Sequence, residues 1–328
     1  GYGNPALVAP DAAQVADAII VNNAKDPYWT DAGKNLMRGI ILHLVSSSRQ
    51  TATIREVRRL VCSKTEDLET LFTAMSKSTA FNGVVANIGA AFLGKLASPK
   101  ELQGILSTVQ EQTAQFDDLV HVMDRSDVKL TDLHKGGVTI YLVLPATRLA
   151  THYRWLRLML QLALGAMERA PVPRGGLPVW FVLEEFPTLG HMKSIETAAG
   201  LMAGYGVKLW TVLQDLTQLK THYSKSWETF LGNAGVLQAF GNTDMTTSEY
   251  ISQRLGMTQV IERQEARVTG GAMAHGDLGM RENLRSVRLL DANEVTQWFA
   301  RETARQLILV AGVPPIYLDR LQIERTRP

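Results

Sequence analysis

The chain has 328 residues, of which 45% are hydrophobic and 20% are charged, and its formal net charge is +2. These values are typical of a folded protein long enough for two domains, and they exclude collagen-like, disordered and strongly basic chains. The single cysteine, Cys62, excludes an internal disulfide and a multi-cysteine zinc site, and no apolar run approaches the roughly 20 residues that span a bilayer, so we expect no transmembrane segment in this chain.

Residues from Asp11 to about Phe116 are predicted to form helices. Asp26 and Pro27 supply a cap and a first-turn proline at the start of one of them. Behind this start, apolar residues recur at the spacing of an amphipathic helix: Leu36, Met37, Ile40, Ile41 and Leu44. We therefore predict an all-helical domain over residues 21–116, preceded at residues 1–20 by a linker from a missing upstream region.

Two further helix starts have the spacing of a capping box, in which a hydroxyl and an acid three residues later satisfy backbone N–H groups reciprocally. These are Ser63 with Glu66, and Ser98 with Glu101. Apolar stripes follow both starts: Leu68, Leu71, Phe72, Met75, Leu102, Ile105, Leu106 and Val109. We expect these stripes to pack together as the core of a small helical bundle.

Residues 89–95 (GAAFLGK) have the glycine and lysine spacing of a phosphate-binding loop. The next residue is Leu96, however, where such a loop needs a hydroxyl group for magnesium, and no apolar strand precedes the segment. Val85, Ile88 and Phe92 have helical spacing in the same region. We therefore predict a helix here and not a phosphate-binding loop.

The hydrophobic pattern changes after about Asp117, where apolar runs typical of strands begin to alternate with helical stretches. The first run, Val138–Leu144, follows a pair of glycines and is stopped by Pro145. It is predicted to be a buried strand. A long amphipathic helix follows, and it is expected to end before Pro171.

The second apolar run, Val179–Leu183, leads directly into Glu184 and Glu185, and Phe186 and Pro187 then end it. An uninterrupted run of large apolar residues is typical of a strand that is buried on both faces. Both carboxylates therefore fall at the carboxyl end of a predicted strand. In open α/β sheets, ligands bind in the crevice outside this end of the strands.

A third strand is predicted over Val207–Leu213 and is followed by Gln214, and later strand candidates are Val236–Phe240 and Leu307–Val310. A helix is expected between the second and third strands, from about Met192. Strands that alternate with helices predict an α/β fold, with a parallel sheet covered on both sides and right-handed crossovers.

The acidic pair has two interpretations, which are evenly balanced on this stretch alone. In a P-loop nucleotidase, one carboxylate at such a strand end holds magnesium, usually through water, and the next orients the attacking water. The alternative is a pair of acids that leave a strand into solvent. Gln214 can sense the γ-phosphate or hold the attacking water, or it can simply cap the strand end. Beside Glu184 and Glu185, the functional role is the better interpretation.

Several segments carry a resemblance to a known family. Three of them are 184–190 (EEFPTLG), 204–210 (GYGVKLW) and 214–220 (QDLTQLK). Shorter matches occur in the same order along nearly the whole chain: 26–29 (DPYW), 141–145 (YLVLP), 227–233 (WETFLGN), 240–244 (FGNTD), 250–252 (YIS) and 312–316 (GVPPI). Together they resemble the TraG-like coupling proteins of type IV secretion and bacterial conjugation.

The resemblance implies a RecA-like P-loop NTPase domain with an all-helical domain inserted into it. It implies a hexameric ring at the cytoplasmic face of the bacterial inner membrane, anchored by N-terminal transmembrane helices. Such rings use ATP and Mg²⁺ to move DNA, bound to a relaxase, or effector proteins toward the secretion channel, together with adaptors and other secretion components. By this resemblance Glu184 takes the magnesium side of the Walker B pair, Glu185 is the catalytic carboxylate and Gln214 is the sensing glutamine.

Two departures from the family pattern affect these assignments. The family usually has Asp where this chain has Glu184, which is longer by one methylene. The phosphate loop and the first strands of the sheet, which precede the helical domain in the family, are missing from the sequence. Residues 117–328 are therefore expected to be the C-terminal part of an incomplete RecA-like sheet domain. Because backbone amides and a lysine cradle the ATP phosphates in such proteins, this chain alone is expected to bind nucleotide poorly.

Two other functions remain open at this point. The chain can be a non-hydrolysing module that binds substrates or adaptors. It can also be part of a double-stranded DNA translocase of the chromosome-segregation (FtsK-like) type. The helical insertion and the segment 214–219 (QDLTQL) argue against the translocase, because both are features of the coupling proteins. A phosphate loop upstream in the complete protein would separate the motor from the binding module.

Overall fold

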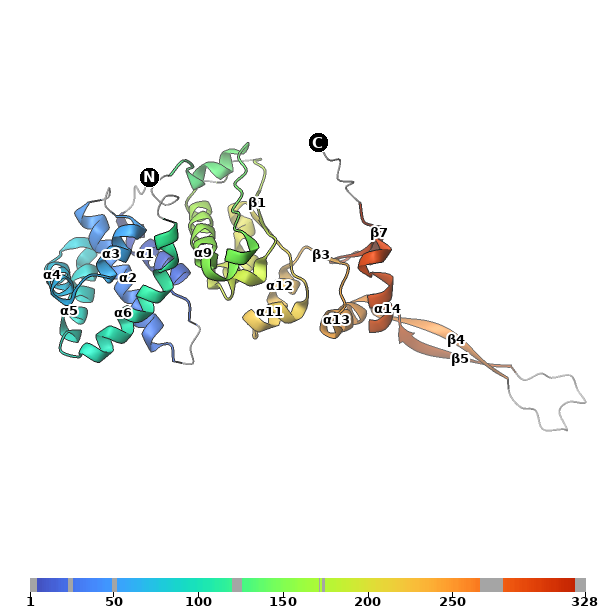
Figure 1. Cartoon of the computed structure of the whole chain (residues 1–328). Coiled ribbons are helices and arrows are strands. Elements are labelled where there is room, and N and C mark those ends of the chain that lie inside the picture. The colour runs from blue at the N-terminus through green and yellow to red at the C-terminus, as the bar shows by residue number, and fades with distance from the viewer. Residues whose placement is uncertain are drawn as a thin grey trace, which may run out of the picture. The chain divides into compact units, whose positions relative to one another are not determined.

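A computed structural model describes residues 5–22, 26–48, 52–119, 126–170, 172, 175–265 and 280–321 (Figure 1). The chain folds into two compact units, residues 1–211 and 212–328. Each unit has a hydrophobic core of its own. The fold is mixed α/β, and helices predominate over strands in the described residues. The predicted boundary between residues 116 and 117 stays a prediction.

The first unit begins with a set of helices that share one core. Leu36, Met37 and Ile40 are completely buried in it, as their helical spacing predicts. None of the helices in the described ranges has both the length and the hydropathy needed to cross a bilayer. The elements are α1 (Pro5–Ile19), α2 (Tyr28–Ser47), α3 (Ile54–Val61), α4 (Thr65–Ser76), η1 (Ala80–Gly83), α5 (Val84–Lys95), α6 (Pro99–Thr113) and α7 (Gln115–Asp118).

The helix starts of this bundle are stabilised differently from the prediction. Asp26 does act at the start of α2, because its Oδ1 accepts a hydrogen bond from the backbone N–H of Tyr28 at 3.0 Å. Neither predicted capping box forms. The hydroxyl of Ser63 donates backward to Leu60 O, and Ser98 precedes α6 without a side-chain capping bond. Helical propensity and burial therefore start α4 and α6 without these caps.

Residues 89–95 lie within α5, so the prediction of a helix in place of a phosphate-binding loop is confirmed. Gly89 serves helix packing. A Cβ added to Gly89 would lie 2.5 Å from the backbone nitrogen of Ser76 in α4. Since backbone atoms cannot move aside as a flexible side chain can, only glycine permits α4 and α5 to approach this closely.

The predicted buried strand Val138–Leu144 is wrong. This segment follows η2 (Leu130–Lys135), and none of the described strands forms a ladder with it. Tyr141 is 82% exposed and Val143 is 76% exposed. A strand is held by hydrogen bonds to a neighbour, so this apolar run, without one in the described residues, stays exposed and without regular secondary structure. The helix predicted after it is confirmed as α9 (Ala146–Arg169), which packs against α1.

The strand that precedes the acidic pair is confirmed as β1 (Val179–Leu183). It pairs in parallel with β2 (Val207–Thr211), from Val179 opposite Val207 to Leu183 opposite Thr211. Helix α10 (Lys193–Leu201) and η4 (Met202–Tyr205) connect the two strands, as expected for parallel neighbours. The prediction that β1 is buried on both faces is wrong, because Trp180 is 55% exposed and Val182 is 52% exposed.

The second unit is built around a separate, antiparallel sheet. The strands predicted near residues 236–240 and 307–310 are confirmed, but β3 pairs antiparallel to β6, and β6 pairs antiparallel to β7. The prediction of one parallel sheet is therefore wrong beyond β1 and β2 in the described part of the chain. The elements are α11 (Leu216–His222), α12 (Trp227–Asn233), β3 (Val236–Ala239), α13 (Met245–Leu255), α14 (Ala292–Trp298), η6 (Arg301–Thr303), β6 (Arg305–Val310) and β7 (Ile316–Asp319).

A two-stranded ribbon that the sequence analysis did not predict follows α13. It consists of β4 (Met257–Glu265) and β5 (Met280–Arg288), which pair antiparallel along their whole length (Figure 1). The ribbon is anchored at its base, where Arg288 forms a 2.7 Å ion pair with Glu249 of α13 and donates to the hydroxyl of Ser252. An isolated ribbon is only marginally stable in water, so these contacts with α13 hold its base in place.

Candidate functional site

Glu184 and Glu185 follow the last residue of β1 in a tight turn, and both side chains are exposed. Within the described ranges, neither carboxylate has a side-chain hydrogen bond or an ion pair. The backbone at Glu185 has φ −111° and ψ 49°, and it leads directly into η3 (Phe186–Leu189). The structure thus leaves both predicted acids free to bind a ligand at the carboxyl end of a strand.

Buried residues directly behind the acidic pair hold its turn in place. Phe186 and Leu189 are buried in the first unit. The backbone N–H of Thr188 donates to Glu185 O at 3.0 Å, which closes the turn. Gly190 then ends η3 with a positive φ of 62°, a backbone conformation that residues with a Cβ rarely adopt. The acids are therefore presented by a short, anchored turn.

Arg157 of α9, which the sequence pattern did not predict as a site residue, positions this turn. Its side chain is only 3% exposed. The guanidinium donates to three backbone carbonyls, through Nε to Ala18 O at 2.9 Å and through Nη1 to Leu189 O and to His191 O. It therefore ties the end of α1 to the segment that follows the acidic pair. A signal was available, since Arg157 interrupts the apolar run 155–160 (WLRLML) of a predicted helix.

The neighbouring strand β2 leads toward Gln214. Leu183 lies opposite Thr211, so β1 and β2 end at the same edge of the sheet, as the sequence analysis required. Gln214 is three residues beyond Thr211 and belongs to the second unit. The structure thus confirms that the strands preceding the acidic pair and the glutamine are neighbours.

Gln214 is held through its backbone, and its side chain is exposed. Its N–H donates to Gln218 Oε1 at 3.1 Å, and its carbonyl accepts from Asn242 Nδ2 at 3.2 Å. The capping role belongs to the next residue, because Asp215 Oδ1 accepts from the N–H of Gln218 at the start of α11. The Gln214 side chain itself has no hydrogen-bond partner in the described residues, so it is available to a ligand.

Hydrogen bonds connect segments 214–220 and 240–244 around Gln214. Besides Asn242, segment 240–244 contributes Asp244, whose carboxylate caps α13 by accepting from the N–H of Thr247 at 2.8 Å. The hydroxyl of Thr247 then accepts from the N–H of Leu216, at the start of α11. Segments 240–244 and 214–220 therefore form one hydrogen-bonded framework that fixes the backbone of Gln214.

The edge next to the acids is flanked by an exposed aromatic sheet face. Trp180 of β1 and Trp210 of β2 meet edge to face, with their ring centroids 6.1 Å apart. Lys208 Nζ lies 5.4 Å from the centroid of Trp180. Together with Val182, these side chains leave a contiguous, largely apolar surface on the sheet, of a kind that soluble proteins usually cover.

The arrangement suits a magnesium ion that is held partly by other groups. Mg²⁺ in nucleotide sites commonly keeps several waters and takes one or two carboxylates together with substrate phosphates. Glu184 and Glu185 provide two exposed, unpartnered carboxylates of this kind. No group of three or more His, Cys, Asp and Glu side chains capable of holding a metal occurs within the described ranges. The residues present therefore fit a water-mediated Mg²⁺ beside a bound phosphate.

The chain matches a protein-family model over almost its whole length. The model described as "Type IV secretory system Conjugative DNA transfer" matches residues 4–322. The chain belongs to this conjugative DNA transfer family. The resemblance expected from segments 184–190, 204–210 and 214–220 is thereby confirmed.

Curated relatives agree with this membership. The chain is 26% identical over 338 residues to the conjugal transfer protein TraG of Escherichia coli, covering 94% of this chain and 53% of TraG. It is 28% identical over 207 residues to the protein VirD4 of Agrobacterium fabrum, covering 60% of this chain and 29% of VirD4. The chain thus spans about half the length of the TraG protein that it matches.

Solved structures of a bacterial conjugative coupling protein, TrwB, share the fold of this chain. An unbound form of the bacterial conjugative coupling protein TrwB superposes with a TM-score of 0.72 at 15% identity, covering 98% of this chain and 70% of the TrwB chain. TrwB in complex with the non-hydrolysable ATP analogue ADPNP superposes with a TM-score of 0.71 at 14% identity, with coverages of 99% and 71%. At this identity the likeness supports the mixed α/β fold alone.

Proposed function

We propose that this chain carries the carboxylate side of the ATP site in a type IV secretion coupling protein. The observation that carries the proposal is the free Glu184–Glu185 pair at the end of β1, beside the strand that leads to Gln214. Membership of the conjugative DNA transfer family supports this proposal, because an acidic pair at a strand end is what a P-loop nucleotidase uses for magnesium and for the attacking water. The complete protein would recruit DNA bound to a relaxase, or effector proteins, and pass them to the secretion channel.

Each candidate residue has a distinct role in this proposal. Glu184 holds Mg²⁺ through water, and Mg²⁺ neutralises charge on the nucleotide phosphates when it is bound. Glu185 orients and deprotonates the attacking water. Gln214, fixed through its backbone by Asn242, senses the γ-phosphate. TrwB structures in complex with ADPNP and with ADP and Mg²⁺ support ATP and Mg²⁺ as the cofactors.

The described residues do not supply a phosphate cradle. The segment with phosphate-loop spacing, residues 89–95, is part of a helix. The exposed aromatic face of β1 and β2 is suited to be covered by further helices of a RecA-like domain, and the exposed apolar segment 138–144 is suited to join its sheet. We therefore assign the phosphate loop, the remaining strands and a membrane anchor to a larger protein, a hexamer at the cytoplasmic face of the inner membrane.

A second candidate is a non-hydrolysing module that recruits substrates or adaptors. This candidate is favoured by the helical structure of residues 89–95, which have the spacing of a phosphate loop but cannot act as one. A protein without a phosphate cradle does not bind ATP well. The family match favours both candidates over a chromosome-segregation translocase. The two candidates differ in whether the acidic pair takes part in turnover.

The magnesium side of the site provides the test. In the complete protein, Glu184→Ala is expected to raise the Mg²⁺ concentration for half-maximal ATP turnover by about 10- to 100-fold, the usual effect of losing a water-mediated metal partner. Glu184→Asp, which introduces the residue usual in TraG-like proteins, should stay close to the parent. A titration of ATPase activity with Mg²⁺ measures both. An unchanged Mg²⁺ requirement in Glu184→Ala would remove Glu184 from the magnesium site, and an absence of ATP turnover in the complete parent protein would favour the non-hydrolysing module.

A further inference from the structure

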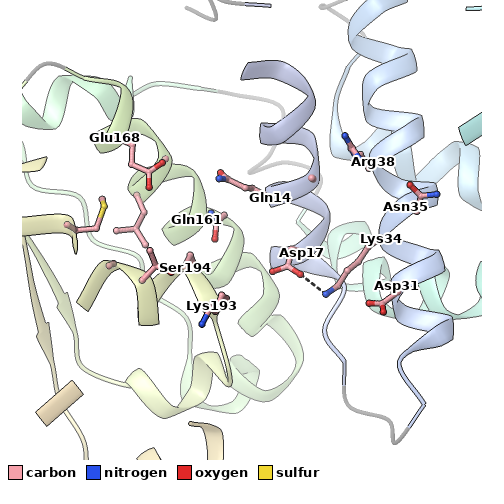
Figure 2. Close-up of a pocket in the computed structure, with 16 residues that line it drawn as sticks. Gln14, Asp17, Asp31, Lys34, Asn35, Arg38, Gln161, Glu168, Lys193 and Ser194 are labelled. Atoms are coloured by element: carbon pink, nitrogen blue, oxygen red, sulfur yellow. Dashed lines mark hydrogen bonds and ion pairs between the residues drawn. The ribbon is translucent and has the colours of Figure 1, made fainter. Parts of the chain in front are cut away.

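A pocket of about 570 Å³ lies within the first unit, along α1, with α2 on one side and α9 and α10 on the other (Figure 2). Its volume is in the range of sites for small molecules and short peptides. Three acidic and three basic side chains line it: Asp17, Asp31, Lys34, Arg38, Glu168 and Lys193. The pocket is separate from Glu184 and Glu185, which do not line it.

Two of the three bases in the pocket already have partners. Lys34 forms an ion pair with Asp17, as Figure 2 shows, and Lys193 forms one with Glu196 at 3.0 Å. Arg38 has neither a hydrogen bond nor an ion pair within the described ranges. Its Nε is buried from solvent and lacks a hydrogen-bond partner there. Arg38 as a whole is only half-buried, so a carboxylate that enters the pocket can pair with the accessible side of this unpaired guanidinium.

Arg38 also lines a second, smaller pocket of about 320 Å³, together with Asn35, Asn87 and Ile88. The same arginine therefore borders two hollows on α2. A ligand group entering either one reaches the guanidinium without displacing an existing ion pair. This is a position from which an arginine can select for a carboxylate.

The opposite side of the larger pocket offers the complementary charge. Glu168 of α9 has no side-chain partner in the described part of the chain, and Figure 2 shows it on the α9 side, with Arg38 on the α2 side. Buried apolar side chains line the pocket as well, among them Leu164, Ala198 and Met202. The pocket thus combines an anion-binding group, a cation-binding group and an apolar wall.

The charge balance decides which class of ligand fits. Nucleic acids and nucleotides need an excess of positive charge, and three acids offset three bases here. A peptide that carries one acidic and one basic side chain around an apolar residue matches all three features. We propose that this pocket binds such a peptide segment of a recruited protein, with its carboxylate on Arg38 and its basic group on Glu168.

The biological meaning of this site rests on the proposed recruiting role, but its test does not depend on ATP. Fluorescence polarisation with the full chain would use labelled peptides in which Glu and Lys flank Ala-Leu-Ala, in both orders. Matched peptides replace Glu or Lys by Gln. The parent chain should bind at least one order about tenfold more tightly than its Gln-substituted forms.

Variants of the pocket assign the contacts. Arg38→Gln should weaken the Glu-containing peptide about tenfold and leave the peptide with Gln in place of Glu unchanged, and Glu168→Gln should do the same for the Lys side. Arg148→Gln and Glu69→Gln, exposed changes outside the pocket, should have no effect. Arg38→Glu should regain binding to a peptide in which Lys replaces Glu.

Two results would overturn the proposal: no preference of the parent chain for the doubly charged peptides, or equal binding by the parent, Arg38→Gln and Glu168→Gln. Thermal unfolding of each variant shows whether the fold is retained, and the regained binding of Arg38→Glu separates lost contacts from lost structure. A failure here leaves the effect of Glu184 on the Mg²⁺ requirement untouched. The two proposals can therefore fail independently.

Discussion

Replacing Glu185 by Gln in the complete coupling protein is expected to lower ATP turnover by at least about 100-fold, which is the usual contribution of a general base. The amide keeps the size and the turn geometry of the side chain but cannot accept a proton. Because Glu185 is exposed and has no partner among the described residues, the change removes no structural contact. ATP binding should therefore stay close to that of the parent.

Glu69→Gln on α4 is the matched control, since it removes an exposed carboxylate far along the chain from the acidic turn. Steady-state ATPase assays and nucleotide-binding titrations on both variants make the comparison. Normal turnover in Glu185→Gln would remove this residue from the chemistry. A parallel loss of binding and turnover would instead assign Glu185 to nucleotide binding.

Replacing Arg157 by Met is expected to lower the free energy of unfolding of this chain by about 3 kcal/mol or more, because hydrogen bonds from a charged donor to buried acceptors are lost together. Arg157 serves the carbonyls of Ala18, Leu189 and His191. Met fills a similar volume but donates nothing, so these carbonyls lose a buried donor. The turn that presents Glu184 and Glu185 should loosen as well.

Arg148→Met provides the matched control, because Arg148 lies on the same helix with an exposed side chain. Its unfolding free energy should stay within about 0.5 kcal/mol of the parent. Urea unfolding measures both variants, and hydrogen exchange at residues 186–191 reports on the turn. Equal stability of Arg157→Met and Arg148→Met, with unchanged exchange, would contradict the positioning role.

Local sequence predicts the strand closest to the site, but it does not predict which elements cover that strand. The apolar run before Glu184 correctly predicts β1, because a strand needs only a short segment of suitable residues. The same run gives no information on what covers each face. Trp180 and Val182 are exposed because neither sheet neighbours nor helices in the described residues cover that side. Burial depends on partners, and partners are not encoded in the run itself.

Strand direction shows the same limit. Apolar runs near residues 236 and 307 predict strands, and both form. The path of the chain between these two strands sets their antiparallel pairing. The alternation of strands with helices along the sequence therefore wrongly predicted that they belong to one parallel sheet. Arg157 is a further case, because its three acceptors lie 139, 32 and 34 residues away in sequence. The one indication of this positioning role in the sequence is that Arg157 interrupts an apolar stripe.

The most direct test of the account is binding of a fluorescent ATP analogue with Mg²⁺ to this chain alone, with Glu185→Gln alongside. We expect no saturable binding up to roughly 1 mM, the upper end of ordinary nucleotide affinities, because the described residues supply carboxylates and no phosphate cradle. The complete protein, to which we assign the phosphate loop, should bind the analogue. Tight binding by this chain that changes in Glu185→Gln would contradict the account, since the phosphates would then be held by groups within these 328 residues.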